Sequence, residues 1–237
     1  MATLKVLAAL LHYPDEALQA HAAELLAALD ADGLVRGARR AALRSLVARL
    51  RDEELLELQS EYVETFDRGR SRSLYLFEHV YGESRDRGQA MVELIGAYRE
   101  HGLEIAAAEL PDYLPLFLEF LSRMPVADAL GWLEEIGPVL QLLHARLAAR
   151  PSPYAVVLEP LVRLAGLAPE AKVDEQVAAE TPDDTPEALD RVWMESPVSF
   201  GGPEDSCGAA QDKTRNRESA RSPTPTETVR WQDPPAH

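Results

Sequence analysis

The sequence predicts an all-α fold: a compact, single-domain bundle of about nine helices, followed by a disordered C-terminal tail. Two observations about composition indicate helices. Hydrophobic residues make up 46% of the chain and are mostly Leu and Ala, which lose little conformational freedom in a helix, whereas aromatic residues contribute only 6%. The third observation is periodicity, because apolar residues recur three and four positions apart and no alternating strand pattern appears between hairpin turns.

The first four helices have recognisable boundaries. A Tyr13-Pro14 pair separates the first two, because proline disfavours a continuing helix at the residue before it. The second ends at the Asp-Ala-Asp-Gly of residues 30–33, and Asp52 is an expected N-cap for the fourth. The expected spans are residues 3–12, 15–30, 36–50 and 53–66.

The next five helices follow a polar loop. Ser73 and Ser84 are expected to cap the fifth and sixth, and Gly102 stands where a helix often ends in a left-handed residue. Gly137-Pro138 is expected to kink the eighth. The expected spans are residues 73–81, 84–101, 113–124, 126–149 and 154–165.

A dense aromatic patch lies directly before a charge cluster in SLYLFEHVYGESRDRG, residues 73–88. As a strand, this segment would place Tyr75, Phe77, His79 and Tyr81 on one face. As a helix, it would separate Tyr75 and His79 from the face that carries Phe77 and Tyr81. The helical surroundings favour the helix. The segment is either a core helix that runs into a polar turn or the edge of a binding surface.

The chain divides in composition near residue 168. We expect a helical domain over residues 1–168 and an acidic, Pro-rich, largely disordered tail over residues 169–237, because few apolar residues remain there to form a core. The WMESPVSFG segment at 193–201 is a candidate docking motif within that tail, although a free tail is the simpler interpretation.

The net charge of −16 argues against nucleic acid as a partner, because phosphate binding needs a basic stripe. We expect no direct membrane insertion and a cytoplasmic location, since the apolar N-terminal run is too short to span a bilayer and lacks the features of a signal peptide. The single cysteine, Cys207, excludes an intrachain disulfide.

Sequence motifs for catalysis are missing. The chain contains no glycine-rich phosphate loop, no GxSxG and no HExxH, so we expect no enzyme activity, no cofactor and no metal. Glu78 and His79, with Glu83 and Asp86, leave a metal-assisted enzyme open as one alternative. A general helical adaptor that binds several partners is another.

A carboxylate-rich loop precedes the most apolar helix in AELPDYLPLFLEF. The simpler interpretation is that Asp112 caps this helix at the positive end of its dipole. The alternative is that the loop and the aromatic residues behind it form one wall of a groove for a peptide with both basic and apolar side chains.

A family resemblance rests on several of these segments together. LYLFEHVYGESRDRGQAMVELIGAYREHGLEI and ELPDYLPLFLEFL resemble the NarJ-type nitrate reductase assembly chaperones, a branch of the TorD/DmsD-like redox-enzyme maturation chaperones. LLHYPDE near the N-terminus, EYVETFD and WMESPVSFG also fit, so the resemblance spans residues 4–201. It implies a TorD-like, all-α chaperone that is not part of the final enzyme.

The resemblance also implies partners and a site. The expected partner is the N-terminal peptide of the nitrate reductase α (catalytic) subunit, held while molybdenum cofactor and iron–sulfur centres are inserted; cofactor-delivery proteins are a second expected class. The client could instead be the catalytic subunit of another molybdoenzyme. The wider family carries Glu-Pro-x-Asp-His where this chain has Glu109-Leu110-Pro111-Asp112-Tyr113, so no role of that histidine is carried over. The expected peptide-binding residues are Tyr75, Phe77, Glu78, Tyr81, Glu83, Asp86, Glu109, Pro111, Asp112, Tyr113 and Phe117.

Overall fold

The computed structural model describes residues 1–82, 84–105 and 109–193, and all the regular secondary structure in these residues is helical. The expected all-α class is therefore confirmed. The helices of the first half are α1 (Ala2–Leu10), α2 (Glu16–Ala20), α3 (Ala22–Asp32), α4 (Gly37–Asp52), α5 (Leu55–Phe66), the short 3₁₀ helix η1 (Arg70–Arg72) and α6 (Leu76–Tyr81). The helices of the second half are α7 (Asp86–Glu100), α8 (Leu114–Ser122), α9 (Val126–Glu135), α10 (Gly137–Ala148), α11 (Ala155–Leu164), α12 (Ala171–Ala178) and α13 (Pro186–Trp193).

The described residues hold more helices than the nine expected. The second expected helix is divided at His21 into α2 and α3, and the eighth is divided at Ile136 into α9 and α10. Pro138 lies in the first turn of α10, where a missing amide hydrogen costs nothing. The proline therefore begins a new helix instead of kinking a continuous one.

Three expected caps are displaced. Asp52 is the last residue of α4, and α5 begins after Glu54. Likewise, α6 begins after Tyr75 instead of Ser73, because residues 74–76 pair with another segment of the chain. Helix α7 begins after Arg85, with the Asp86 amide donating to Ser84 Oγ at 3.2 Å.

The expected stop at Gly102 is confirmed, and its geometry explains why glycine stands there. Gly102 has a φ of 71°, a left-handed conformation that glycine adopts without a steric penalty. Its amide donates to the Arg99 carbonyl at 2.9 Å, and the Leu103 amide donates to the Tyr98 carbonyl at 2.9 Å. These two bonds are the Schellman pattern, which satisfies the last carbonyls of α7.

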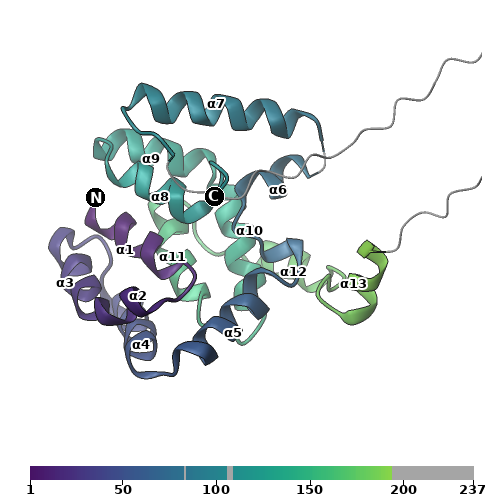
Figure 1. The fold of residues 1–237 in the computed structure, drawn as a ribbon, viewed down its shortest axis with the longest axis horizontal. Helices are drawn as coiled ribbons and strands as arrows, with labels where there is room; N and C mark the ends of the chain where they lie inside the picture. The colour runs from purple at the N-terminus through teal and green to yellow at the C-terminus, as the bar shows by residue number, and fades with distance from the viewer. Residues whose placement is uncertain (83, 106–108, 194–237) are drawn as a thin grey trace, which may run out of the picture. The chain divides into compact units, whose positions relative to one another are not determined.

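Helical structure continues past residue 168. Helix α12 packs against α10, and α13 follows α12 in the chain (Figure 1). The predicted division of the chain at residue 168 stays a prediction, but residues 171–178 and 186–193 are helical. The docking motif at 193–201 lies outside the described residues apart from Trp193, whose backbone ends α13, and Cys207 lies outside them too.

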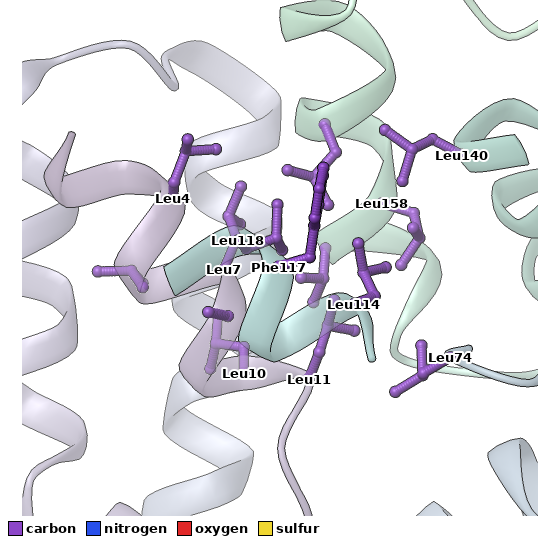
Figure 2. Close-up of a cluster of buried hydrophobic side chains, with 14 of the residues drawn as sticks. Leu4, Leu7, Leu10, Leu11, Leu74, Leu114, Phe117, Leu118, Leu140 and Leu158 are labelled. Atoms are coloured by element: carbon purple, nitrogen blue, oxygen red, sulfur yellow. The ribbon is translucent and has the colours of Figure 1, made fainter. Parts of the chain in front are cut away.

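The core is built mainly from leucine. Helix α1 packs most extensively against α8, which is distant in sequence, and α10 packs against α11, which follows it; residues of all four helices belong to one apolar core. Figure 2 shows Leu4 and Leu7 of α1, and Leu11 directly after it, gathered with Leu114 and Phe117 of α8. Further leucines come from α10 and α11. This packing holds the start of α8, and the loop that leads into it, in a defined place.

Phe117 belongs to this core. Its side chain is 2% exposed, so it has no surface free to contact a peptide. The sequence prediction that Phe117 lines a groove is therefore not supported by its position. On a helix that is apolar on several faces, the local pattern does not separate core positions from positions facing a pocket.

Replacing Phe117 by alanine tests this placement. We expect Phe117→Ala to lower the free energy of unfolding by about 3–5 kcal/mol, because it removes a buried ring and leaves a cavity. The measurement is urea denaturation followed by circular dichroism. Leu56 is 77% exposed, so Leu56→Ala is the control and should change stability by less than about 0.5 kcal/mol. Equal effects of the two changes would contradict the assignment.

Candidate functional site

Two segments far apart in the sequence pair as short extended pieces. Tyr75 and Tyr113 form an isolated antiparallel β-bridge. The Leu76 amide donates to the Asp112 carbonyl at 3.0 Å, and the Leu114 amide donates to the Leu74 carbonyl at 2.8 Å. We call this pairing of residues 74–76 with residues 112–114 the clip. The favoured helix interpretation of the aromatic segment is confirmed for Leu76–Tyr81, which is helix α6, and the strand interpretation of residues 75–81 is wrong. Only Tyr75 and the residues just before it are extended.

The carboxylate of Asp112 strengthens the clip. Asp112 is fully buried, and its Oδ2 accepts a hydrogen bond from the Phe77 amide at 3.0 Å. Phe77 lies in the first turn of α6, where the amides have no partner within the helix. Asp112 therefore caps α6 and not α8, whose own N-cap position is held by Tyr113. Asp112 is a helix cap, as predicted, but the prediction that it caps the helix that follows it is wrong.

Burial places an electrostatic cost on the same carboxylate. Desolvation raises the pKa of Asp112 above its ordinary value, and the hydrogen bond from Phe77 only partly opposes this. Its Oδ1 has no hydrogen-bond partner among the described residues. Asp112 is thus a structural acid inside the domain, without a surface on which it could meet a basic side chain.

A pocket of about 780 Å³ opens beside the clip. Its apolar wall contains the rings of Tyr13, Tyr62, Phe66, Tyr75 and Tyr113. Its polar lining contains both signs of charge. The charged lining residues are Asp67, Arg68, Arg70, Glu78, Glu109 and Asp183.

Hydrogen bonds hold the aromatic wall together. The Tyr62 hydroxyl donates to the Leu11 carbonyl at 2.9 Å and lies 3.0 Å from the Tyr113 hydroxyl. The Tyr62 ring contacts Phe66 at 4.8 Å and Tyr13 at 5.4 Å between centroids. Burial raises the pKa of both Tyr62 and Tyr113, so both stay protonated at neutral pH. The wall is a preformed, uncharged surface.

The rim of the pocket contains a tyrosine–carboxylate pair. The Tyr75 hydroxyl donates to Glu109 Oε2 at 2.8 Å, and the Tyr75 ring lies 5.4 Å from that of Tyr113. Burial, followed by the nearby Glu109, raises the pKa of Tyr75, so Tyr75 remains the donor. The backbone between Glu109 and the clip is tied to α7, because the Tyr98 hydroxyl donates to the Pro111 carbonyl at 2.7 Å. Glu109 itself is exposed and free to meet a cation.

Four of the predicted binding residues line this pocket together: Tyr75, Glu78, Glu109 and Tyr113. Glu78 also forms an ion pair with Arg87 at 3.4 Å. Pro111 and Asp112 are buried beneath the rim and shape it without lining it.

The remaining predicted residues do not line the pocket. Phe77 and Tyr81 contact each other, with ring centroids 5.4 Å apart, while Asp86 is exposed at the start of α7. Glu83 lies outside the described residues.

Several pocket residues were not predicted from the sequence. Tyr62 and Phe66 fall within the expected helix of residues 53–66 without a predicted site role, and Tyr13 was recognised only as part of a helix break. The loop of residues 67–70 carried no recognisable motif. Each becomes a lining residue through contacts between segments distant in sequence, and such contacts leave no local periodic signal.

His79, considered above as a metal ligand, uses both ring nitrogens elsewhere. Its Nε2 lies 2.8 Å from the Ser73 carbonyl, and its Nδ1 lies 3.3 Å from Arg146 Nη1. Burial lowers the pKa of His79, which favours a neutral ring that donates from Nε2 and accepts at Nδ1. Within the described ranges, no three His, Cys, Asp or Glu side chains are grouped closely enough to hold a metal ion.

Comparison with known proteins gives a consistent family. The model for the family described as nitrate reductase delta subunit matches residues 14–158. The nitrate reductase molybdenum cofactor assembly chaperone NarJ of Escherichia coli K12 is 47% identical over 201 residues, which are 84% of this chain and 85% of that protein. The probable assembly chaperone NarW of the same strain is 44% identical, covering 84% of each chain. The probable NarJ of Bacillus subtilis 168 is 33% identical over 68% of this chain and 86% of that protein.

The cap formed by Asp112 can be tested by substitution. We expect Asp112→Ala to lower the free energy of unfolding by about 1–2 kcal/mol, because the first turn of α6 loses its acceptor. Thermal unfolding measured by circular dichroism reports the change. Glu134→Ala, which removes an exposed carboxylate from the end of α9, is the control and should cost less than about 0.5 kcal/mol. A stability of Asp112→Ala equal to that of the unmodified protein would show that the cap is not needed.

Proposed function

The chain belongs to the nitrate reductase delta subunit family, and we propose that it is a molybdenum cofactor assembly chaperone for a respiratory nitrate reductase. Its relatives are named for the assembly of that enzyme and not for a catalytic activity. The observation that carries the proposal is the identity of 47% over most of both chains. On this proposal the protein acts on the catalytic subunit before assembly is complete and is not part of the final enzyme.

We further propose that the bound part of the client is the N-terminal peptide of the catalytic subunit, and that it binds in the pocket beside the clip. The aromatic wall suits the apolar face of a short amphipathic helix, a common mode of peptide recognition. Glu78, Glu109 and Asp67 suit basic side chains at its margin. Tyr75 and Tyr113 would supply the central contact area, because tyrosine gives a large surface with few rotatable bonds.

Simple energetics allow reversible binding of such a peptide. Burying about 600 Å² of apolar surface contributes about 15 kcal/mol before costs. Ordering the peptide costs about 2–5 kcal/mol, and association costs about 4–15 kcal/mol. Net binding remains only at the lower end of these costs, at most about 9 kcal/mol, so the chaperone can hold its client and still release it. The net charge of −16 would speed the encounter with a basic peptide and make binding sensitive to salt.

The proposed work takes place in the cytoplasm, where apoenzyme and cofactor-delivery proteins would meet. Among the described helices, none is long and apolar enough to cross a membrane. Phe77 and Tyr81 on α6 and Asp86 at the start of α7 do not line the pocket, and they would contact the client only if it extends beyond the pocket.

Two other functions remain as alternatives, and they differ in which partners the protein would bind. A chaperone for another molybdoenzyme would bind the catalytic subunit of that enzyme in preference. A general helical adaptor would bind several unrelated partners with similar affinity. The names of the relatives favour nitrate reductase over both.

Calorimetric titration tests the proposed client and site together. A synthetic peptide with the N-terminal sequence of the α subunit, from the same organism, should bind one to one and more weakly as salt increases. Tyr75→Ala should weaken binding about tenfold, because it removes an aromatic contact from the pocket. Tyr81→Ala is the matched control, since Tyr81 lies outside the pocket, and it should change the affinity less than twofold.

Two results would contradict the proposal in different ways. Saturable binding that Tyr75→Ala and Tyr81→Ala weaken equally would move the site away from the pocket. A complete lack of binding by the folded protein, at low and at moderate salt, would reject the N-terminal peptide as the client segment.

A further inference from the structure

The pocket beside the clip already contacts a later part of the same chain. Asp183 and Leu189 line it, and both follow the core helices by about 20 residues or more. We call residues 180–190 the strap; it runs from the end of α12 into α13. Ala188 is buried and Leu189 half-buried, whereas Glu187 and Asp190 are exposed. The strap therefore presents an apolar edge of a short helix to an apolar pocket.

Three acidic side chains fasten the strap to the domain. Asp183 accepts hydrogen bonds from the amide and the hydroxyl of Ser71, both at 2.7 Å. Asp184 accepts from Arg72 at 3.0 Å and also pairs with Arg150. These contacts join the strap to the 3₁₀ helix at the edge of the pocket.

The third acidic contact of the strap is made by Glu180. Glu180 forms a two-point ion pair with Arg146 at 2.7 and 2.8 Å. Arg146 also donates to the Ser71 carbonyl at 2.9 Å and contacts His79. The strap is thus connected to α10, to the 3₁₀ helix and to α6, which carries one side of the clip.

The carboxylates of Asp183 and Asp184 are ionised at neutral pH, because the pKa of each is lowered. Burial alone would raise the pKa of Asp183, but the hydrogen bonds from Ser71 outweigh it, and the pKa is lowered. The pKa of Asp184 is lowered in the same way, with Arg150 and Arg72 opposing burial. The strap contacts are therefore available throughout the neutral range and are lost only in acid.

Asp183 of the strap approaches Gly69 too closely for any side chain at residue 69. A Cβ placed on Gly69 would lie 2.5 Å from Asp183 Oδ1, which is closer than non-bonded atoms tolerate. The φ of Gly69 is −150°, an ordinary extended value, so the backbone conformation does not require glycine. The strap is what leaves no room for a side chain at this position.

We propose that the strap is an internal competitor for the client: Leu189 occupies part of the space that an apolar side chain of the client helix takes, so the client binds only when the strap leaves. This inference rests on the proposed function and adds its regulation. The client class it names is a basic, amphipathic helix with an aliphatic anchor residue. Such a helix has an advantage over the strap, because Glu187 and Asp190 of the strap are acidic like the rim residues Glu78 and Glu109, and a basic client is not.

With such competition, the apparent Kd of the client equals its intrinsic Kd divided by the fraction of molecules whose pocket is open. Variants that open the strap should therefore bind more tightly. Leu189→Ala removes an aliphatic side chain of the strap that lines the pocket, and Gly69→Ala displaces the Asp183 carboxylate, which a Cβ at this position would contact too closely. In full-length protein, each should lower the Kd of the α-subunit N-terminal peptide about three- to tenfold. The matched control is Leu34→Ala, an exposed leucine between α3 and α4, which should leave the Kd unchanged.

Amide hydrogen exchange measures directly whether the strap leaves the pocket when the peptide binds. If Leu189 had only a structural role, peptide binding would not change the exchange rates of the strap amides. On addition of saturating peptide to the unmodified protein, amides of residues 183–189 and the Ser71 amide should exchange faster, while amides of residues 73–77 should exchange more slowly. Thermal unfolding of each variant establishes that the domain remains folded.

The outcomes separate the inference from the function on which it rests. Tighter binding by Leu189→Ala and Gly69→Ala, with loss of strap protection on peptide binding, supports the competitor. Peptide binding that leaves strap protection unchanged, or a Kd that Leu189→Ala leaves unchanged or raises, overturns the competitor and leaves the proposed function standing. A peptide that binds none of the folded variants rejects the proposed function, and the competitor falls with it.

Discussion

The pairing of residues 74–76 with residues 112–114 is the constraint on which the candidate site depends. It places a buried carboxylate, Asp112, against the first turn of α6, where free amides need an acceptor. The same pairing brings Tyr75 beside Tyr113 and positions Glu109 at the hydroxyl of Tyr75. A carboxylate without solvent is costly, so Asp112 specifies this one arrangement more than it adds stability. The pocket follows from that arrangement.

The site combines an uncharged aromatic wall with charged side chains at its rim. The interior contacts require neutral aromatic groups, and burial keeps the hydroxyls of Tyr62 and Tyr113 protonated. The rim requires charge, since a chain with a net charge of −16 attracts basic peptides over a distance set by the ionic strength. The aromatic wall would supply affinity, and the net negative charge of the chain, with the exposed Glu109 at the rim, would increase the encounter rate. Asp184 and Glu180 of the strap pair with Arg72 and Arg146, which do not line the pocket. These ion pairs therefore do not involve the rim residues Glu78 and Glu109.

The sequence predicted what local chemistry determines and missed what tertiary contact determines. The all-α class and the stop at Gly102 follow from propensity and backbone geometry within a few residues. The sequence located an irregularity at Pro138 but predicted a kink, whereas a new helix begins there. Asp112 was recognised as a cap, but its partner lies 35 residues earlier, and no local pattern indicates a partner at that distance. Phe117 was expected in a groove and lies in the core, because both positions read as apolar on one helix. The polar composition after residue 168 concealed α12 and α13, each of which, among its described side chains, buries a single small apolar one, Val177 or Ala188, beside acidic residues that pair with arginines earlier in the chain.

The central claim is that the aromatic wall beside the clip contacts the client peptide, and photo-crosslinking tests it most directly. A peptide of the α-subunit N-terminus, with benzoylphenylalanine at one apolar position, is irradiated with the full-length protein, and the adducts are located by mass spectrometry. We predict adducts within residues 62–75 and at Tyr113, which excess unlabelled peptide abolishes. Competed adducts confined to α3, α4 or α9 would contradict the claim, because those helices contribute no lining to the pocket.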